Sequence, residues 1–224
     1  MLDMMYRAAR RRVADLVSTL RDDQRRTPVP ATPGWTVHDV LAHLVGGAAD
    51  LASGRLDGAP GDAWTSRHVA ERRHHSVAEL LAEWERIGPA VESGLATAQF
   101  SGPNLAGDVI GHEADLHEAL GLARPDRAHW QPVLEVMMAL VGRRLRHGTA
   151  LVIRDEHGQQ WRCGSGDPET LLRADGYELL RGAFSRRSQR QIAAWDWTPA
   201  PTAQMTERFG LFGPREDDQP IPVG

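Results

Sequence analysis

The apolar residues in the first half of the chain recur at the spacing of amphipathic helices. In the first segment they form one stripe, which comprises Tyr6, Ala9, Val13, Leu16, Val17 and Leu20. A second helix is predicted over 36–52, because Thr36-x-x-Asp39 has the form of a capping box. A third helix is predicted from Ser76 onward, where Ser76-x-x-Glu79 repeats the same signal.

A fourth helix is predicted over 107–121, and Gly121 stands where a helix C-cap glycine belongs. In the third helix, Gly88–Pro89 is expected to cause a break or a kink. Four amphipathic helices joined by loops are typical of a four-helix bundle. We therefore expect a bundle over residues 1–124.

In the second half of the chain, the spacing of the apolar residues no longer indicates helices alone. After a linker at 122–130, a fifth helix is predicted over 132–148. The segments 149–155 and 159–165 flank a short turn with a glycine, which predicts a β-hairpin. A further helix is predicted over 175–197. The fold class is therefore α+β and mainly α, with a small α+β domain over 125–205 and an irregular tail over 206–224.

The composition excludes some classes of function. The 224 residues carry a net charge of −4, and all 26 basic residues are arginines that are scattered among acids. This balance favours neither a nucleic acid nor a membrane as a partner. The N-terminus lacks the apolar core of a signal peptide, so a cytoplasmic location is expected. The single cysteine, Cys163, lies in a predicted strand and allows no internal disulfide.

The segment 107–121 contains two acid-x-x-x-His steps. Asp108 precedes His112, and Glu113 precedes His117. On a helix both pairs border the buried stripe, so helical geometry does not choose between them. Either pair can contribute to a metal site, and either can be a simple side-chain pair on the helix surface.

Two other groups of histidines need an interpretation. His43 lies roughly 120° from the apolar centre of its own helix, which counts against an inward-facing ligand. His68, His74 and His75 lie among arginines, so they are interpreted as a solvated helix start, with a metal-binding pair as the alternative.

Three segments together resemble a known family. They are "TPGWTVHDVLAHL", "HVAERRHHSVAELLAEWE" and "GHEADLHEALG". In this order they are similar to the mycothiol-dependent maleylpyruvate isomerase family of actinobacteria, whose N-terminal half is a metal-binding bundle of the DinB-like type. The C-terminal "LLRGAFSRRSQRQIAAWDW" resembles the arginine-bearing helix of that family. The likeness covers roughly residues 5–200.

The resemblance implies a set of three metal ligands, namely His43, Asp108 and His112. Glu113 and His117 then lie outside the set. The departure from the family pattern is Asp108, because members commonly carry glutamate there, so the carboxylate reaches less far by one methylene group. Two imidazoles and a carboxylate suit Zn²⁺ or another divalent first-row metal, and three protein ligands leave coordination positions open.

The resemblance also implies mycothiol as the thiol cosubstrate and a small-molecule substrate. The expected activity is a cis–trans isomerisation or the transfer of the thiol to an electrophile, with Arg186 binding a carboxylate of the substrate and Arg187 as the alternate. A homodimer is compatible with this expectation. The competing hypothesis from another class is a non-catalytic protein that binds a metal or a small ligand.

Overall fold

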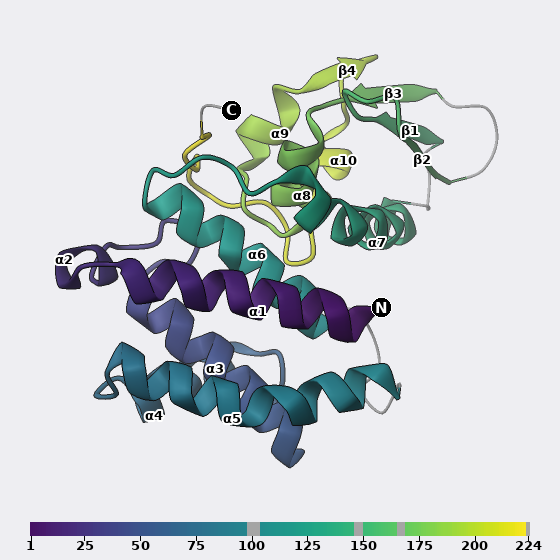
Figure 1. Cartoon of the computed structure of the whole chain (residues 1–224). Helices are drawn as coiled ribbons and strands as arrows, with labels where there is room; N and C mark the ends of the chain where they lie inside the picture. Colours follow the sequence, from purple (N-terminus) through teal and green to yellow (C-terminus); the bar gives the residue numbers. More distant parts are fainter. Residues whose placement is uncertain (98–103, 146–149, 165–168, 223–224) are drawn as a thin grey trace. The chain divides into compact units, whose positions relative to one another are not determined.

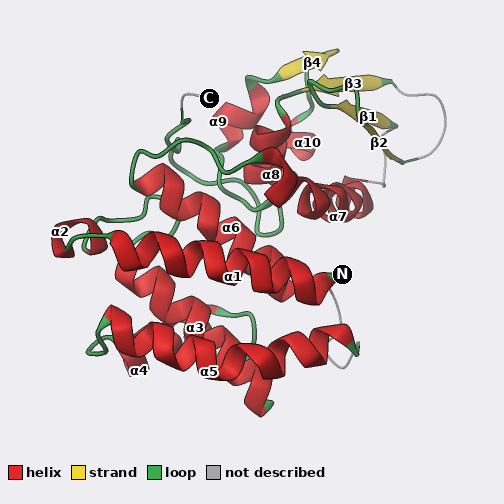
Figure 2. Ribbon diagram, viewed as in Figure 1, coloured by secondary structure: helices red, strands yellow, loops and turns green. Residues whose placement is uncertain are grey.

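The structure is a computed structural model that describes residues 1–97, 104–145, 150–164 and 169–222. The chain divides into two compact units, Met1–Pro125 and Asp126–Ile221 (Figure 1). It is mainly helical, with one small sheet, as the α+β prediction requires (Figure 2).

In its described residues, 1–97 and 104–125, the N-terminal unit is a bundle of four long helices with two short ones. The long helices are α1 (Leu2–Thr19), α3 (Val37–Ser53), α5 (Val77–Ala96) and α6 (Asn104–Ala119), and the short ones are α2 (Asp22–Arg25) and α4 (Asp62–Arg72). Helices α1 and α3 each pack against both α5 and α6, and α4 packs against α3. This is the predicted four-helix bundle, with α4 added on one side of α3.

Three of the predicted helix ends are confirmed, whereas α6 begins at Asn104, before the predicted start at 107. Thr36 and Asp39 form a reciprocal capping box at the start of α3, and Ser76 and Glu79 form another at the start of α5. After α6, Gly121 adopts a positive φ of 64°, and Leu122 N–H donates to the carbonyl of His117. A helix C-cap of this kind favours glycine because a Cβ disfavours positive φ.

Two features of the bundle differ from the sequence prediction. Gly88–Pro89 does not break the helix, since α5 continues through both residues to Ala96, while a kink there stays a prediction. Burial of Val91 and Leu95 beyond the proline favours continuation of the helix at the expense of one backbone hydrogen bond. Helix α4 begins at Asp62, between the second and third predicted helices, where only a connecting loop is expected. Its many charged residues conceal the helical period.

The core of the bundle contains one hydrogen bond between aromatic side chains. Trp84 Nε1–H of α5 donates to Tyr6 Oη of α1 over 2.9 Å, and both side chains are almost fully buried. Tyr6 belongs to the predicted apolar stripe of α1, of which Ala9, Val13 and Val17 are also buried. Burial raises the pKa of Tyr6, so its hydroxyl stays protonated.

The C-terminal unit combines a four-stranded sheet with helices. Its elements are α7 (Arg127–Leu145), β1 (Leu151–Arg154), β2 (Gln160–Cys163), β3 (Thr170–Arg173), α8 (Gly176–Ala183), α9 (Gln189–Ala193), β4 (Asp196–Thr198) and α10 (Ala203–Glu207). The sheet order is β2-β1-β3-β4, with β1 antiparallel to β2 and parallel to β3, and β3 antiparallel to β4. The predicted hairpin is thus confirmed as β1–β2, with Ile153 opposite Trp161.

Other predictions for this unit need correction. Helix α7 begins at Arg127, within the expected linker, and the end predicted for it at 146–148 lies outside the described residues. The long helix predicted over 175–197 is wrong. The chain instead forms α8, turns at Ser185 with a φ of 62°, and continues as α9 and β4. Nothing in the sequence signals that turn, because the residue with positive φ is not a glycine.

The segment expected as an irregular tail has little regular structure after α10, but it packs onto the unit. Phe209 is fully buried, Leu211 N–H donates to the carbonyl of Ala183, and Arg215 N–H donates to that of Arg187. Among the helices within the described residues, none has the length and apolar character needed to cross a membrane.

The Tyr6–Trp84 hydrogen bond should couple α1 to α5 energetically. Trp84→Phe leaves a buried hydroxyl without its donor, so we expect it to lower the free energy of unfolding by about 1–3 kcal/mol. Denaturant titration monitored by circular dichroism measures this change. The double variant Tyr6→Phe/Trp84→Phe should cost less than the sum of the single changes, by on the order of 1 kcal/mol. If the losses in free energy of unfolding of the two single variants simply add in the double variant, the hydrogen bond contributes nothing.

Candidate metal centre

His43 lies in the middle of α3 and faces inward. It is only 4% exposed, and the residues on both sides of it along the helix are buried as well. The expectation that it points away from the core is therefore wrong. A helical wheel assumes one buried face, whereas α3 packs against α4, α5 and α6 and is enclosed on several sides.

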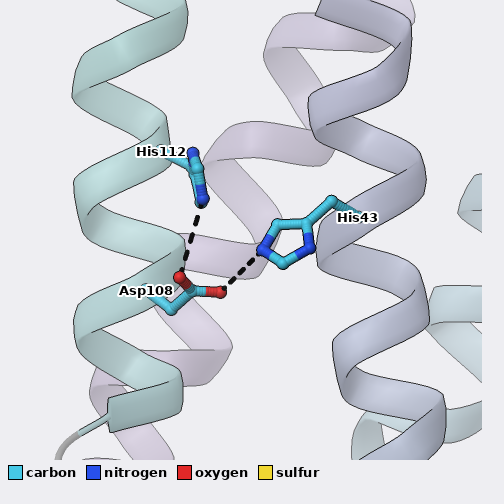
Figure 3. A group of neighbouring side chains, drawn as sticks. All are labelled: His43, Asp108 and His112. Atoms are coloured by element: carbon cyan, nitrogen blue, oxygen red, sulfur yellow. Dashed lines mark ion pairs between the residues drawn. The ribbon is translucent and has the colours of Figure 1, made fainter. Parts of the chain in front are cut away.

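Helix α6 brings Asp108 and His112 to the same place. They are four residues apart and project from one face toward α3 (Figure 3). Asp108 Oδ2 lies 3.5 Å from His43 Nε2, and Asp108 Oδ1 lies 3.6 Å from His112 Nε2. The aspartate therefore reaches both imidazoles, in spite of its short side chain.

The donor atoms of these three side chains fit one divalent cation. They all lie within 4.8 Å of one another. Bond lengths of about 2.0–2.2 Å place the ligands of a tetrahedral zinc ion roughly 3.3–3.6 Å apart. The two distances from Asp108, one from each carboxylate oxygen, are close to that separation. Asp108 is 39% exposed while both histidines are buried, so the group meets solvent at the aspartate.

The other acid-x-x-x-His pair of α6 has different partners. Glu113 is buried, and its two oxygens accept hydrogen bonds from Arg12 of α1 at 2.6 and 2.7 Å. His117 Nδ1 lies 2.6 Å from the carbonyl oxygen of Ala123, beyond the helix end. The two pairs therefore contact different helices. Asp108 and His112 lie beside α3, whereas Glu113 binds Arg12 of α1.

His112 has a second carboxylate behind it. Asp115 Oδ2 lies 2.9 Å from His112 Nδ1, the ring nitrogen that points away from the three-residue group, although the approach is not aligned for a hydrogen bond. Asp115 is fully buried. An imidazole that binds a metal through one nitrogen commonly has a carboxylate at the other. The spacing of three residues from His112 could have indicated this partner from the sequence.

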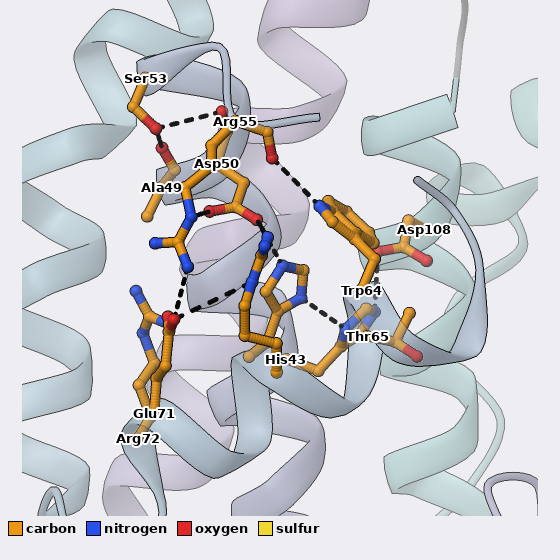
Figure 4. Close-up of polar contacts among 12 residues, drawn as sticks. His43, Ala49, Asp50, Ser53, Arg55, Trp64, Thr65, Glu71, Arg72 and Asp108 are labelled. Atoms are coloured by element: carbon orange, nitrogen blue, oxygen red, sulfur yellow. Dashed lines mark hydrogen bonds and ion pairs between the residues drawn. The ribbon is translucent and has the colours of Figure 1, made fainter. Parts of the chain in front are cut away.

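His43 has a corresponding group behind it, which the sequence analysis missed. Its Nδ1 lies 3.2 Å from Nδ1 of His68, and His68 Nε2 lies 3.0 Å from Asp50 Oδ2. His43 and Asp50, the two ends of this chain of contacts, are labelled in Figure 4. His68 is 0% exposed, so its interpretation as part of a solvated helix start is wrong. The signal in the sequence is weak, because charged neighbours surround His68 in α4.

The charges of this inner group follow from its contacts. Burial alone would raise the pKa of Asp50, but the hydrogen bonds from His68 and Arg67 outweigh it and hold the pKa below its usual value. Burial lowers the pKa of His68, an effect that the contact with Asp50 only partly opposes. At neutral pH the pair therefore consists of a carboxylate and a neutral imidazole.

The predicted arginines belong to the C-terminal unit. Arg186 is half-buried in the turn between α8 and α9, not on a helix as expected, and its Nη1 donates to the carbonyl of Phe184 over 3.0 Å. Arg187 is fully buried and donates two hydrogen bonds to Glu178, at 2.6 and 2.8 Å. The buried ion pair makes Arg187 a structural residue.

The cysteine is buried in the same unit. Cys163 ends β2, is 1% exposed, and has a pKa that burial raises to about 11. Its thiol is therefore protonated at neutral pH, which is the opposite of what a nucleophilic cysteine requires.

Comparisons with known proteins agree with the architecture. Among curated proteins none matches the chain. Among solved structures, the mycothiol-dependent maleylpyruvate isomerase and a mutant of it with one histidine replaced by alanine both match with a TM-score of 0.60 and 14% identity. Each alignment covers 90% of this chain and 93% of the other. At this identity the match shows that the fold is shared.

A family model supplies the remaining evidence. The model described as the mycothiol maleylpyruvate isomerase N-terminal domain matches residues 6–149, which include α3 and α6 and therefore all three residues of the candidate metal centre. This match covers more than half of the sequence. The chain therefore belongs to the mycothiol maleylpyruvate isomerase N-terminal domain family.

Proposed function

We propose that this protein is a metal-dependent enzyme that uses mycothiol as its thiol cosubstrate, in a cis–trans isomerisation or in thiol transfer to an electrophile. The observation that carries the proposal is the convergence of His43, Asp108 and His112 from α3 and α6 on one point. Membership of a family named for a mycothiol-dependent isomerase supports the thiol.

Each of the three residues has a distinct part in the proposed site. His43 and His112 offer Nε2 atoms from buried positions, and Asp108 offers a carboxylate at the exposed side. A divalent metal held there, with zinc the best fit to these donors, would lower the pKa of a coordinated thiol and keep it as a thiolate at neutral pH. The exposure of Asp108 leaves an approach for the thiol and for the substrate.

The aromatic side chains near His43 restrict how the ring can turn. Trp35 stacks at a tilt with its ring centre 5.1 Å from that of His43, and Trp64 meets the ring edge-on at 6.4 Å. An imidazole packed between two indoles has few rotamers open to it, so its Nε2 stays directed at the site.

Arg186 is proposed to bind a carboxylate of the substrate. Its backbone is held by the turn at Ser185, where Ser185 Oγ accepts a hydrogen bond from Phe212 N–H over 2.9 Å. Its side chain is half-buried, whereas that of Arg187 is fully buried and donates hydrogen bonds to Glu178 and to the carbonyl of Arg186. A guanidinium can bind a carboxylate through two parallel hydrogen bonds.

Metal binding tests the site directly. Protein purified without chelator should contain about one equivalent of a divalent metal, and His112→Ala should lower the affinity for Zn²⁺ by about 100-fold or more, since it removes a direct ligand. Competition with a chromophoric chelator measures this affinity. His117→Ala is the matched control on the same helix and should bind as the unsubstituted protein does. Equal losses in both variants, or none in either, would contradict the ligand assignment.

Turnover tests the proposed chemistry. With mycothiol present, loss of maleylpyruvate absorbance should depend on metal and should disappear in His43→Ala. A second assay, with mycothiol and an electrophile in place of maleylpyruvate, detects thiol transfer. Activity in either assay supports an enzyme. A protein that binds stoichiometric metal and is inactive in both would instead be the non-catalytic binding protein.

The proposed role of Arg186 predicts a defect in substrate binding. Arg186→Gln should raise KM for a carboxylate-bearing substrate by about 10- to 100-fold, the range expected for a lost hydrogen bond to a charged group, and should leave metal content unchanged. Arg190→Gln, at an exposed arginine of α9 that pairs with Asp218, is the control and should keep the original KM. An unchanged KM in Arg186→Gln would contradict the assignment.

A further inference from the structure

Behind His43, away from Asp108, the bundle contains a polar chain that no part of the proposed chemistry uses. It runs from His43 of α3 to His68 of α4 and back to Asp50 of α3. All three side chains are buried, with exposures of 4%, 0% and 4%. Buried polar groups are costly to maintain, so a chain of three within one helix pair calls for a reason.

We propose that His68 is a positioning residue for the metal centre, which holds His43 in the tautomer that leaves Nε2 free to bind the cation. The inference rests on the proposed metal site and goes beyond it, because it assigns a role to a residue that would not touch the metal. The three ligands alone leave the proton of His43 unassigned.

The hydrogen bonds define where each proton must lie. The carboxylate of Asp50 can only accept, so His68 Nε2 must donate to it across 3.0 Å. A neutral His68 then carries no proton on Nδ1, which makes Nδ1 an acceptor. His43 Nδ1 lies 3.2 Å away and must therefore be the donor. With its proton on Nδ1, His43 presents an unprotonated Nε2 toward Asp108.

The backbone spacing makes this chain possible. His43 and Asp50 are seven residues apart, two helical turns, so they lie on the same face of α3. The ring of His68 spans the distance between them from the neighbouring helix. At the far end, Arg67 and Arg55 pair with Asp50, which fixes the carboxylate as the terminal acceptor.

Gly46 allows His68 to come this close. A Cβ built on Gly46 would lie 2.5 Å from both Cβ and Cγ of His68, closer than real atoms approach. Glycine in a helix interior is less favourable than alanine, so its presence here needs a compensating contact. At the neighbouring Gly47 a Cβ would fit without displacing any side chain, because it would lie at an ordinary 3.7 Å from Trp64.

The two glycines provide a matched pair of variants. Gly46→Ala displaces His68 without removing any polar group, and it should weaken Co²⁺ and Zn²⁺ binding by about 10- to 100-fold, the usual effect of losing a partner behind a metal-binding histidine. The visible spectrum of bound Co²⁺ should also change, since the orientation of one ligand changes. Gly47→Ala should keep the affinity and the spectrum of the unsubstituted protein.

A second pair of variants keeps the test decisive if Gly46→Ala fails to fold. His68→Phe retains an aromatic ring but neither nitrogen, and it should weaken Co²⁺ binding to the same extent. His68→Gln can accept from His43 and donate to Asp50, so it should recover part of the affinity. Thermal denaturation verifies that each variant is folded.

The tautomer itself can be observed without metal. In chelator-treated protein, the long-range ¹H–¹⁵N spectrum of the imidazoles should show His43 protonated on Nδ1, and His68→Phe should shift it toward the Nε2-protonated form. This measurement separates the positioning role of His68 from the proposed metal site, because the tautomer of His43 can be determined even if the unsubstituted protein binds no metal. An unchanged His43 tautomer in folded His68→Phe, or unchanged Co²⁺ affinity there, would overturn the positioning role.

Discussion

A buried imidazole is stabilised by polar groups beside its ring nitrogens, and the N-terminal unit contains two such rings. His43 and His112 are almost inaccessible to solvent, and each has a further polar side chain on the nitrogen that faces away from Asp108. On the other side of each ring, Nε2 lies 3.5 Å (His43) or 3.6 Å (His112) from an oxygen of Asp108. The convergence of the three side chains thus depends on groups that lie behind them.

The hydrogen bond between His43 Nδ1 and His68 Nδ1 also accounts for the close contact between α3 and α4. The ring of His68 lies against the backbone at Gly46, and the edge of Trp64 packs on it at 4.2 Å between ring centres. A short helix rich in charged residues thus contributes one buried imidazole to the bundle. In the proposed function, α3 and α6 hold the cation while α4 sets the orientation of one ligand.

Local signals in the sequence predicted much of the fold but only part of the site. Capping boxes and the glycine after α6 depend on a few adjacent residues, so they could be identified without tertiary information. The inward direction of His43 and the burial of His68 could not, because both arise from contacts between α3 and α4. The turn at Ser185 was missed for a related reason: its positive φ is supported by packing from distant residues.

X-ray absorption of the zinc-loaded protein tests the central claim most directly. The account predicts a first shell of nitrogen and oxygen at about 2.0–2.2 Å, with the outer-shell scattering of two imidazoles and no sulfur. Addition of mycothiol should then introduce one sulfur at about 2.3 Å while both imidazoles remain. A spectrum that shows fewer than two imidazoles in the loaded protein would contradict the assignment of His43 and His112 as ligands.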